Sequence, residues 1–243
     1  MLSAINFQGR VLPYSARPVL RFYYPVMNIS RLIQNGKSDV HDGITMTNTL
    51  TTHLNFFWAG LLKQGQTGGI VPSQRFLIAK MIAPVPEAYR GQIIELGAGT
   101  GALTLRLAAR CPGARILACE LNPTLARDCR DNLMRAGHNG RVEVVSASAE
   151  HLLSEMGRRG MEKPDFIISG IPLGNLGGER VRSLLDAIRQ TLGAGGMFIQ
   201  FQHSLLDRKK IMAKFPNTRT VPVFLNFPPA AVYYAQNSVW SAK

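Results

Sequence analysis

The sequence contains no hydrophobic run long enough to cross a membrane as a helix. No window approaches the roughly 18 consecutive apolar residues that a transmembrane helix needs. No uninterrupted apolar stretch follows the first residues, as it would in a secretory signal. Both absences favour a cytoplasmic protein that is either soluble or bound to a membrane surface. Of the 243 residues, 46% are hydrophobic, which is typical of a globular chain and excludes a largely disordered one.

Cysteine is scarce as well. The only cysteines are Cys111, Cys119 and Cys129, an odd number without the spacing of a metal-ligand motif. We therefore predict reduced thiols that pack inside helices and strands, and no metal site.

Acidic residues are few relative to basic ones. The chain has 15 Asp and Glu against 28 Lys and Arg, a formal net charge of +13 and a pI near 10.2. A positive field of this size favours polyanionic partners, either nucleic acid or an anionic lipid surface. Composition does not distinguish these two classes of partner.

The chain divides into three predicted parts. Residues 1–50 form a basic extension with interleaved aromatic residues and no acid before Asp39. This extension is interpreted either as a poorly ordered arm (or sequence upstream of a start at Met46), or as an element that covers substrate or lies at a membrane interface. Residues 51–85 predict amphipathic helices that cap the substrate or contact a membrane, because one apolar stripe runs along 51–64 at helical spacing. Residues 86–243 form the third part.

Strands and helices alternate throughout residues 86–243, with short loops between them. This order is typical of an α/β fold with a parallel sheet covered on both faces. Phe227-Pro228-Pro229 joins the last two strands without a helix, so we expect the final strand to be antiparallel in a seven-stranded, mostly parallel sheet. The predicted strands are 92–96, 115–120, 142–146, 165–169, 196–202, 219–225 and 230–235. The predicted helices of this part are 101–110, 123–136, 149–158, 178–192 and 205–214.

A glycine-rich loop follows the first of these strands and opens a helix, as a nucleotide-binding loop does. Its spacing is Gly-x-Gly-x-Gly rather than the Gly-x-Gly-x-x-Gly used against a pyrophosphate. A carboxylate stands two residues before the first glycine, where it would repel a pyrophosphate but suits the cationic methionine end of S-adenosylmethionine. The predicted cofactor-binding residues of this loop are Glu95, Gly97, Ala98, Gly99 and Gly101.

The ends of the next three strands supply further predicted cofactor contacts. Glu120, followed by Leu121, ends the second strand some twenty residues after the glycines, where a carboxylate accepts hydrogen bonds from both ribose hydroxyls. The adenine is expected at the end of the third strand, through the hydroxyl of Ser148 or the carboxylate of Glu150. The complete set at these strand ends is Glu120, Leu121, Ser148, Ala149, Glu150, Ser169, Gly170 and Pro172. Together these features predict a Rossmann-like class I methyltransferase with an N-terminal helical appendage.

Four segments of the chain carry a resemblance to a known family: 56–73, 95–101, Ser169-Gly170-Ile171-Pro172-Leu173, and Asn226-Phe227-Pro228-Pro229-Ala230. These segments resemble the bacterial phospholipid N-methyltransferases, which methylate phosphatidylethanolamine. Enzymes that methylate ornithine lipids are similar, so the resemblance leaves the head group open. The chain departs from the family pattern after Gln200-Phe201, where Gln202-His203-Ser204 follows, and residues 1–50 have no recognised family counterpart.

The resemblance implies a lipid amine as methyl acceptor, an anionic membrane surface as partner, and a cytoplasmic protein bound peripherally to the inner membrane. The amine must be neutral to attack, and His203 is the candidate general base. Tyr233 is a candidate to contact the methylated nitrogen through a cation–π interaction.

Two other interpretations stay open. An RNA methyltransferase, such as an adenine N6 dimethyltransferase, fits the high pI, but 169–173 lacks the Asn or Asp and the aromatic residue that such enzymes place there. A protein that binds S-adenosylmethionine without turnover is disfavoured by the intact set of Glu95, glycines and Glu120.

Overall fold

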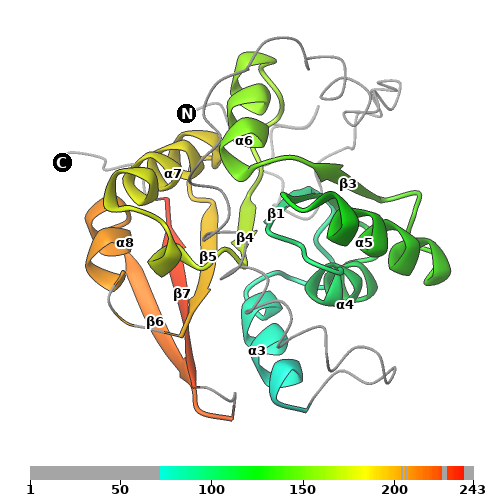
Figure 1. Ribbon diagram of the computed structural model, residues 1–243, viewed down its shortest axis with the longest axis horizontal. Coiled ribbons are helices and arrows are strands. Elements are labelled where there is room, and N and C mark those ends of the chain that lie inside the picture. The colour runs from blue at the N-terminus through cyan, green and yellow to red at the C-terminus, as the bar shows by residue number, and fades with distance from the viewer. Residues whose placement is uncertain (1–71, 204, 206, 226–228, 238–243) are drawn as a thin grey trace, which may run out of the picture.

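The structure, a computed structural model, describes residues 72–203, 205, 207–225 and 229–237. The predicted basic extension and the helix at 51–64 lie outside these residues. Within them the chain forms one seven-stranded sheet in the order β3-β2-β1-β4-β5-β7-β6 (Figure 1).

The first five strands are parallel, and β7 lies antiparallel between β5 and β6. The predicted sheet, including its antiparallel final strand, is therefore confirmed. The strands are β1 (Gln92–Leu96), β2 (Arg115–Glu120), β3 (Val142–Ser146), β4 (Phe166–Ser169), β5 (Met197–Gln202), β6 (Thr218–Val223) and β7 (Ala230–Gln236).

Helices cover both faces of the sheet (Figure 1). One face carries α3 (Pro72–Ile82), α4 (Ala102–Arg110) and α5 (Pro123–Arg135). The other carries α6 (Ala149–Arg158), α7 (Gly178–Thr191) and α8 (Arg208–Lys214), and the short 3₁₀ helix η3 (Leu173–Asn175) follows β4. No helix of the described residues is long and apolar enough to cross a membrane.

Two predicted boundaries near the carboxyl end of β5 and β6 were wrong. The helix expected from residue 205 begins only at Arg208, because Leu205 belongs to a loop and is exposed. The strand expected to reach residue 225 ends at Val223, because Val223 pairs with Ala230, the first residue of β7, and the chain must turn between them. Residue propensities alone predicted a longer strand, whereas the pairing of β6 with β7 limits it to Val223.

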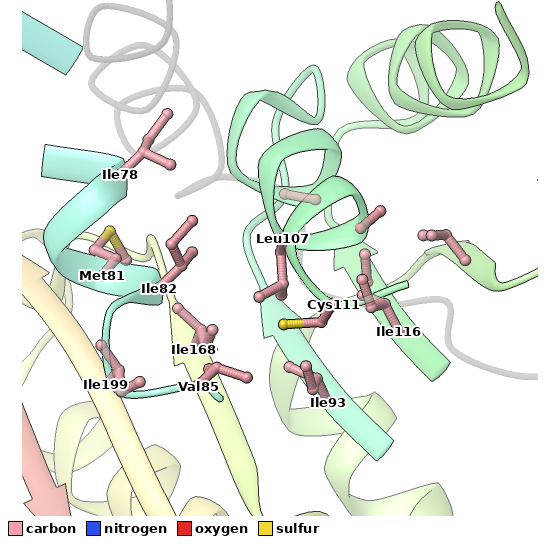
Figure 2. Close-up of a cluster of buried hydrophobic side chains, with 14 of the residues drawn as sticks. Ile78, Met81, Ile82, Val85, Ile93, Leu107, Cys111, Ile116, Ile168 and Ile199 are labelled. Atoms are coloured by element: carbon pink, nitrogen blue, oxygen red, sulfur yellow. The ribbon is translucent and has the colours of Figure 1, made fainter. Parts of the chain in front are cut away.

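The core on the α3 side shows how the described N-terminal helix joins the sheet. Figure 2 shows apolar side chains of α3 gathered with those of α4 and the sheet, including Ile78, Met81, Leu107, Ile168 and Ile199. A hydrogen bond of 2.6 Å from the Tyr234 hydroxyl to the Lys80 carbonyl also joins β7 to α3. The second helix of the predicted cap is therefore packed on the methyltransferase sheet.

The strand order reverses between β1 and β4, which are neighbours in the sheet although β2 and β3 lie between them in sequence. In open α/β sheets, ligands bind outside the carboxyl ends of the strands at this position. The carboxyl edge of β1, β2, β4 and β5 is therefore where the functional residues are expected.

Candidate cofactor and acceptor site

The glycine loop runs from β1 to α4 in a conformation that side chains would obstruct. Gly97 and Gly101 have φ angles of 78° and 89°. A Cβ at Gly97 would lie 3.1 Å from Cγ1 of Ile171, and one at Gly101 would lie 2.7 Å from Sγ of Cys129. The loop is also anchored from α5, since Nδ2 of Asn132 donates to the Thr100 carbonyl at 2.9 Å. Glycine is required here by both backbone angle and space.

Glu120 ends β2 and is bonded to the loops on both sides. Its Oε2 accepts the Gly99 N–H at 2.9 Å, and its Oε1 accepts the Asn122 N–H at 2.9 Å. A carboxylate has about four acceptor positions, so each oxygen retains capacity for a further donor. This arrangement fits the two hydroxyls of a ribose.

Glu95 is a buried carboxyl beside the glycine loop. It is 2% exposed, and no described residue donates a hydrogen bond to its Oε2. Burial raises the pKa of Glu95 to about 8; the Thr104 hydroxyl, which bonds to it, opposes this shift, and the nearby Glu120 charge adds to it. A buried acceptor without a partner fits the ammonium group at the methionine end of S-adenosylmethionine, since that group would supply both a donor and a countercharge.

Glu95→Gln is expected to change how stability depends on pH. The folded protein keeps the Glu95 proton up to about pH 8, whereas the unfolded chain loses it above pH 4.5. The stability that this proton contributes is complete below pH 4.5 and is lost as pH rises towards 8, at about 1.4 kcal/mol per pH unit. In urea unfolding without cofactor, the free energy of unfolding of the variant relative to that of wild type should therefore rise by roughly 3 kcal/mol between about pH 5.5 and 8. A difference that stays constant with pH would contradict this assignment.

The two residues expected at the adenine, Ser148 and Glu150, lie at the start of α6 and contact each other. Ser148 caps α6: its Oγ accepts the His151 N–H at 3.1 Å, and its hydroxyl bonds to the Glu150 carboxylate and helps to lower the pKa of Glu150. Glu150 pairs with Arg180 of α7 at 2.9 Å. The Glu150 carboxylate thus joins Ser148 to α7, and both side chains remain candidates for the adenine. Ala149 is buried and Leu121 is exposed beside Glu120.

The loop after β4 is pressed against the glycine loop. The Gly170 N–H donates to the Leu96 carbonyl at 2.9 Å, and a Cβ at Gly170 would lie 3.1 Å from the Gly97 carbonyl oxygen. Ser169 is fully buried, and its Oγ accepts the Ile171 N–H at 3.2 Å. Pro172 then leads into η3. We call residues 169–172 the acceptor loop, because they lie between the glycine loop and the carboxyl end of β5, where a methyl acceptor is expected.

The two predicted catalytic residues lie in different environments. His203 follows β5 and is exposed, with Nδ1 3.1 Å from the Pro229 carbonyl oxygen. Because a carbonyl only accepts, Nδ1 carries the proton, and the lone pair of a neutral ring is then on Nε2. Tyr233 is fully buried in the core, and its hydroxyl has no partner among the described residues. This burial supports a packing role for Tyr233 and not the cation–π contact expected from sequence.

Some residues near the site were not predicted. Thr104 contacts Glu95, and Asn132 holds the glycine loop. Gln200 and Gln202 lie on one face of buried β5 and are themselves buried. Their only sequence signal was a polar side chain in an otherwise apolar strand or helix.

The cysteines pack in the interior, as predicted. All three are free and buried, and burial raises the pKa of Cys119 and Cys129 to about 12. These two thiols therefore stay protonated at neutral pH and do not act as nucleophiles.

Comparisons with known proteins agree with this geometry. A methyltransferase-domain family model matches residues 93–196. An O-methyltransferase from Bacillus cereus, solved in complex with SAH, covers 85% of this chain and 96% of its own at a TM-score of 0.55 and 18% identity. The match to a SAM-dependent methyltransferase from Agrobacterium tumefaciens covers 70% of this chain and 64% of that one, with a TM-score of 0.56 and 15% sequence identity. The chain is an S-adenosylmethionine-dependent methyltransferase with a Rossmann-like class I fold.

Relatives found by sequence comparison show which kinds of methyltransferase the chain is similar to. An ornithine lipid N-methyltransferase from Singulisphaera acidiphila is 29% identical over 170 residues, which cover 69% of this chain and 86% of that protein. This confirms the resemblance to lipid N-methyltransferases. A tRNA1(Val) (adenine(37)-N6)-methyltransferase from Bacteroides fragilis is 37% identical, but over only 60 residues, 25% of each chain.

Proposed function

We propose that this protein transfers methyl groups from S-adenosylmethionine to the amine of a lipid head group, in phosphatidylethanolamine or an ornithine lipid, while bound to the cytoplasmic face of the inner membrane. The observation that carries the proposal is a group of exposed apolar side chains on the edge of the sheet that holds the cofactor loop. The relative that methylates ornithine lipids supports the choice of acceptor.

This apolar rim consists of Leu121, Leu205, Phe224 and Leu225. Phe224 and Leu225 are 79% and 67% exposed. The four residues follow β2, β5 and β6, whose carboxyl ends lie on the same edge as the glycine loop. Apolar side chains that reach the acyl region, with basic ones at the phosphates, are the usual means of interfacial binding.

Basic side chains accompany the rim. Arg208 and Lys209 begin α8, directly after the loop that carries Leu205, and both are exposed. With the net charge of +13, they favour an anionic bilayer. A lipid held there presents its head group beside the acceptor loop.

The chain's own residues have three tasks in the transfer. Glu95 would hold the methionine end of the cofactor and Glu120 its ribose, and the bound cofactor would supply an activated methyl group. The acceptor loop and the ends of β4 and β5 hold the amine in line with that methyl, since such reactions depend mainly on positioning and exclusion of water. His203, through Nε2, is the proposed acceptor of the amine proton.

The alternative substrate, an adenine in RNA, is disfavoured by the acceptor loop. Ser169 is fully buried and already accepts the Ile171 N–H, so it is not placed to polarise a base amino group. Leu173 stands where a stacking aromatic would be needed, and it is fully buried in the core. Neither hydrogen bonding nor stacking of a flipped base is provided at these positions.

Methyl transfer to defined acceptors tests the proposal. Labelled S-adenosylmethionine should label lipid in anionic vesicles that contain phosphatidylethanolamine or ornithine lipid, and the labelled vesicle identifies the head group. A tRNA transcript, offered in parallel, should stay unlabelled. No lipid product, despite cofactor binding and vesicle association, would exclude both lipids, and labelled tRNA would establish the alternative.

The apolar rim provides a matched variant for the same assay. The double variant Phe224→Ser, Leu225→Ser should bind vesicles and methylate lipid about tenfold less than wild type, because two apolar side chains no longer insert. Its affinity for S-adenosylhomocysteine should be unchanged. Met134→Ser is the control, since Met134 is also an exposed apolar residue, at 59%, but lies near the end of α5, away from the rim. Equal losses in both variants would contradict a specific role of the rim.

A further inference from the structure

Two glutamine side chains bond to one carbonyl of the acceptor loop. Nε2 of Gln200 donates to the Ile171 carbonyl at 2.9 Å, and Nε2 of Gln202 donates to the same oxygen at 3.2 Å. Residues two apart on a strand share a face, so both side chains reach the loop from the same side of β5. The glutamines therefore fix the acceptor loop against the end of β5.

This arrangement saturates the Ile171 carbonyl. A carbonyl oxygen has two lone pairs, and the two amides occupy both. The acceptor amine must consequently find another hydrogen-bond acceptor at this end of the sheet. Because only an amide nitrogen can face a carbonyl oxygen, the Oε1 atoms of both glutamines point elsewhere.

Neither Oε1 atom is used by the part of the chain that the structure describes. Oε1 of Gln200 is buried without a partner, and no described residue donates to Oε1 of Gln202. Native proteins pair nearly all buried acceptors, and of these two atoms only Oε1 of Gln200 is among the buried side-chain atoms without a partner. Gln200 lies deeper in β5, opposite the buried Tyr233, whereas Gln202 ends the strand at the carboxyl edge. Gln202 is thus the residue placed to meet a substrate.

The surroundings of Gln202 connect it to the cofactor side. Its partner Ile171 packs against the glycine loop, with Cγ1 3.1 Å from the place of a Cβ on Gly97. The acceptor loop thus touches the cofactor loop on one side and Gln202 on the other.

We propose that Oε1 of Gln202 binds the amine substrate by accepting a hydrogen bond from its N–H, while Gln200 is a positioning residue that holds the acceptor loop. The proposal rests on the proposed function, because it needs an amine acceptor. In the transfer, the nitrogen lone pair forms the N–C bond as the methyl C–S bond breaks. The C–S electron pair stays on sulfur, and the nitrogen's proton passes to a base or water.

The chemistry of the amide suits this task. The attacking amine must be neutral, and a carboxylate beside it would favour the ammonium form and raise the pKa of the amine. A neutral amide orients the N–H without adding a negative charge. A glutamine at this position therefore holds the amine while leaving its lone pair for the methyl group.

The pH dependence of lipid methylation tests the assignment. Gln202→Glu should shift the alkaline-rising limb of kcat for the lipid, which reports the amine in the enzyme–substrate complex, by about one pH unit to higher pH, and reduce kcat near pH 7 about tenfold. Its affinity for S-adenosylhomocysteine should match that of wild type. Gln236→Glu is the control. Gln236 is an exposed glutamine at the end of β7 that pairs with the start of β5, at the opposite edge of the sheet from Gln202. An active Gln202→Glu variant with an unshifted profile overturns the proposal.

A second variant tests the proposal if the activity of Gln202→Glu is too low for a pH profile to be measured. Gln202→Met keeps the length of the side chain but removes both the acceptor Oε1 and the donor to the Ile171 carbonyl, so Gln200→Met, which removes the other donor to the same carbonyl, is its control. A kcat at least tenfold lower than that of Gln200→Met, with unchanged cofactor affinity and thermal midpoint, supports substrate contact. An unchanged kcat, or a loss matched by equal loss of cofactor affinity, overturns it. Wild type that methylates neither lipid refutes the proposed function itself, and this result is seen before any variant is compared.

Discussion

Glu120→Ala is expected to lower the affinity for S-adenosylhomocysteine at least 100-fold and to remove methyl transfer. Glu120 offers two charged acceptor atoms to the ribose, and hydrogen bonds to charged groups contribute about 1.5–3 kcal/mol each. Two such bonds correspond to roughly 100-fold or more in affinity. The substitution also leaves the Gly99 and Asn122 N–H groups without their present partner. Titration calorimetry with S-adenosylhomocysteine measures the loss directly.

Two further variants separate binding from folding. Glu120→Gln keeps the shape and one neutral acceptor, so its affinity should fall between wild type and Glu120→Ala. Glu179→Ala removes a carboxylate that is almost fully exposed on α7, and it should bind like wild type. An affinity for Glu120→Ala within threefold of wild type would show that Glu120 does not hold the ribose.

Gly101→Ala is expected to destabilise the protein by about 3 kcal/mol and to weaken cofactor binding with it. The left-handed backbone at φ 89° costs a residue with a Cβ about 1–2 kcal/mol. The new methyl would also lie 2.7 Å from Sγ of Cys129, and overpacking of this kind costs about 1–3 kcal/mol. Urea unfolding gives the free energy of unfolding of both proteins.

Another glycine of the same chain separates the backbone cost from the packing cost. Gly137 has φ 73°, but a Cβ there meets no atom within 4 Å, so Gly137→Ala should show the backbone cost alone. Combining Gly101→Ala with Cys129→Ala should recover part of the packing cost in a double-mutant cycle. Equal destabilisation by Gly101→Ala and Gly137→Ala would contradict the proposed clash.

The cofactor side of the site was largely predictable from the sequence. Glycines at alternating positions between a strand and a helix have few other uses, and an acid about twenty residues later marks the next strand end. The structure places Glu95, the glycines and Glu120 around one loop, as expected. The prediction from sequence succeeds here because consecutive parallel strands place their carboxyl ends side by side.

The acceptor side was less predictable. The contacts of Gln200 and Gln202 with Ile171 join residues 29 and 31 positions apart, and nothing local in the sequence signals them. The ion pair of Glu150 with Arg180, 30 positions away on α7, was likewise not signalled by the local sequence. Tyr233 resembled an aromatic at a binding site until strand pairing placed it inside the core.

The sequence by itself determined the class of fold, the cofactor and the lipid-enzyme resemblance, because hydrophobic periodicity, glycine spacing and strand-end acids are local patterns along the chain. The tertiary structure alone decided which polar side chains remain unpaired, which apolar ones form the rim, and which carbonyl of the acceptor loop is already saturated. Pairing and burial depend on neighbours that only the folded chain brings together.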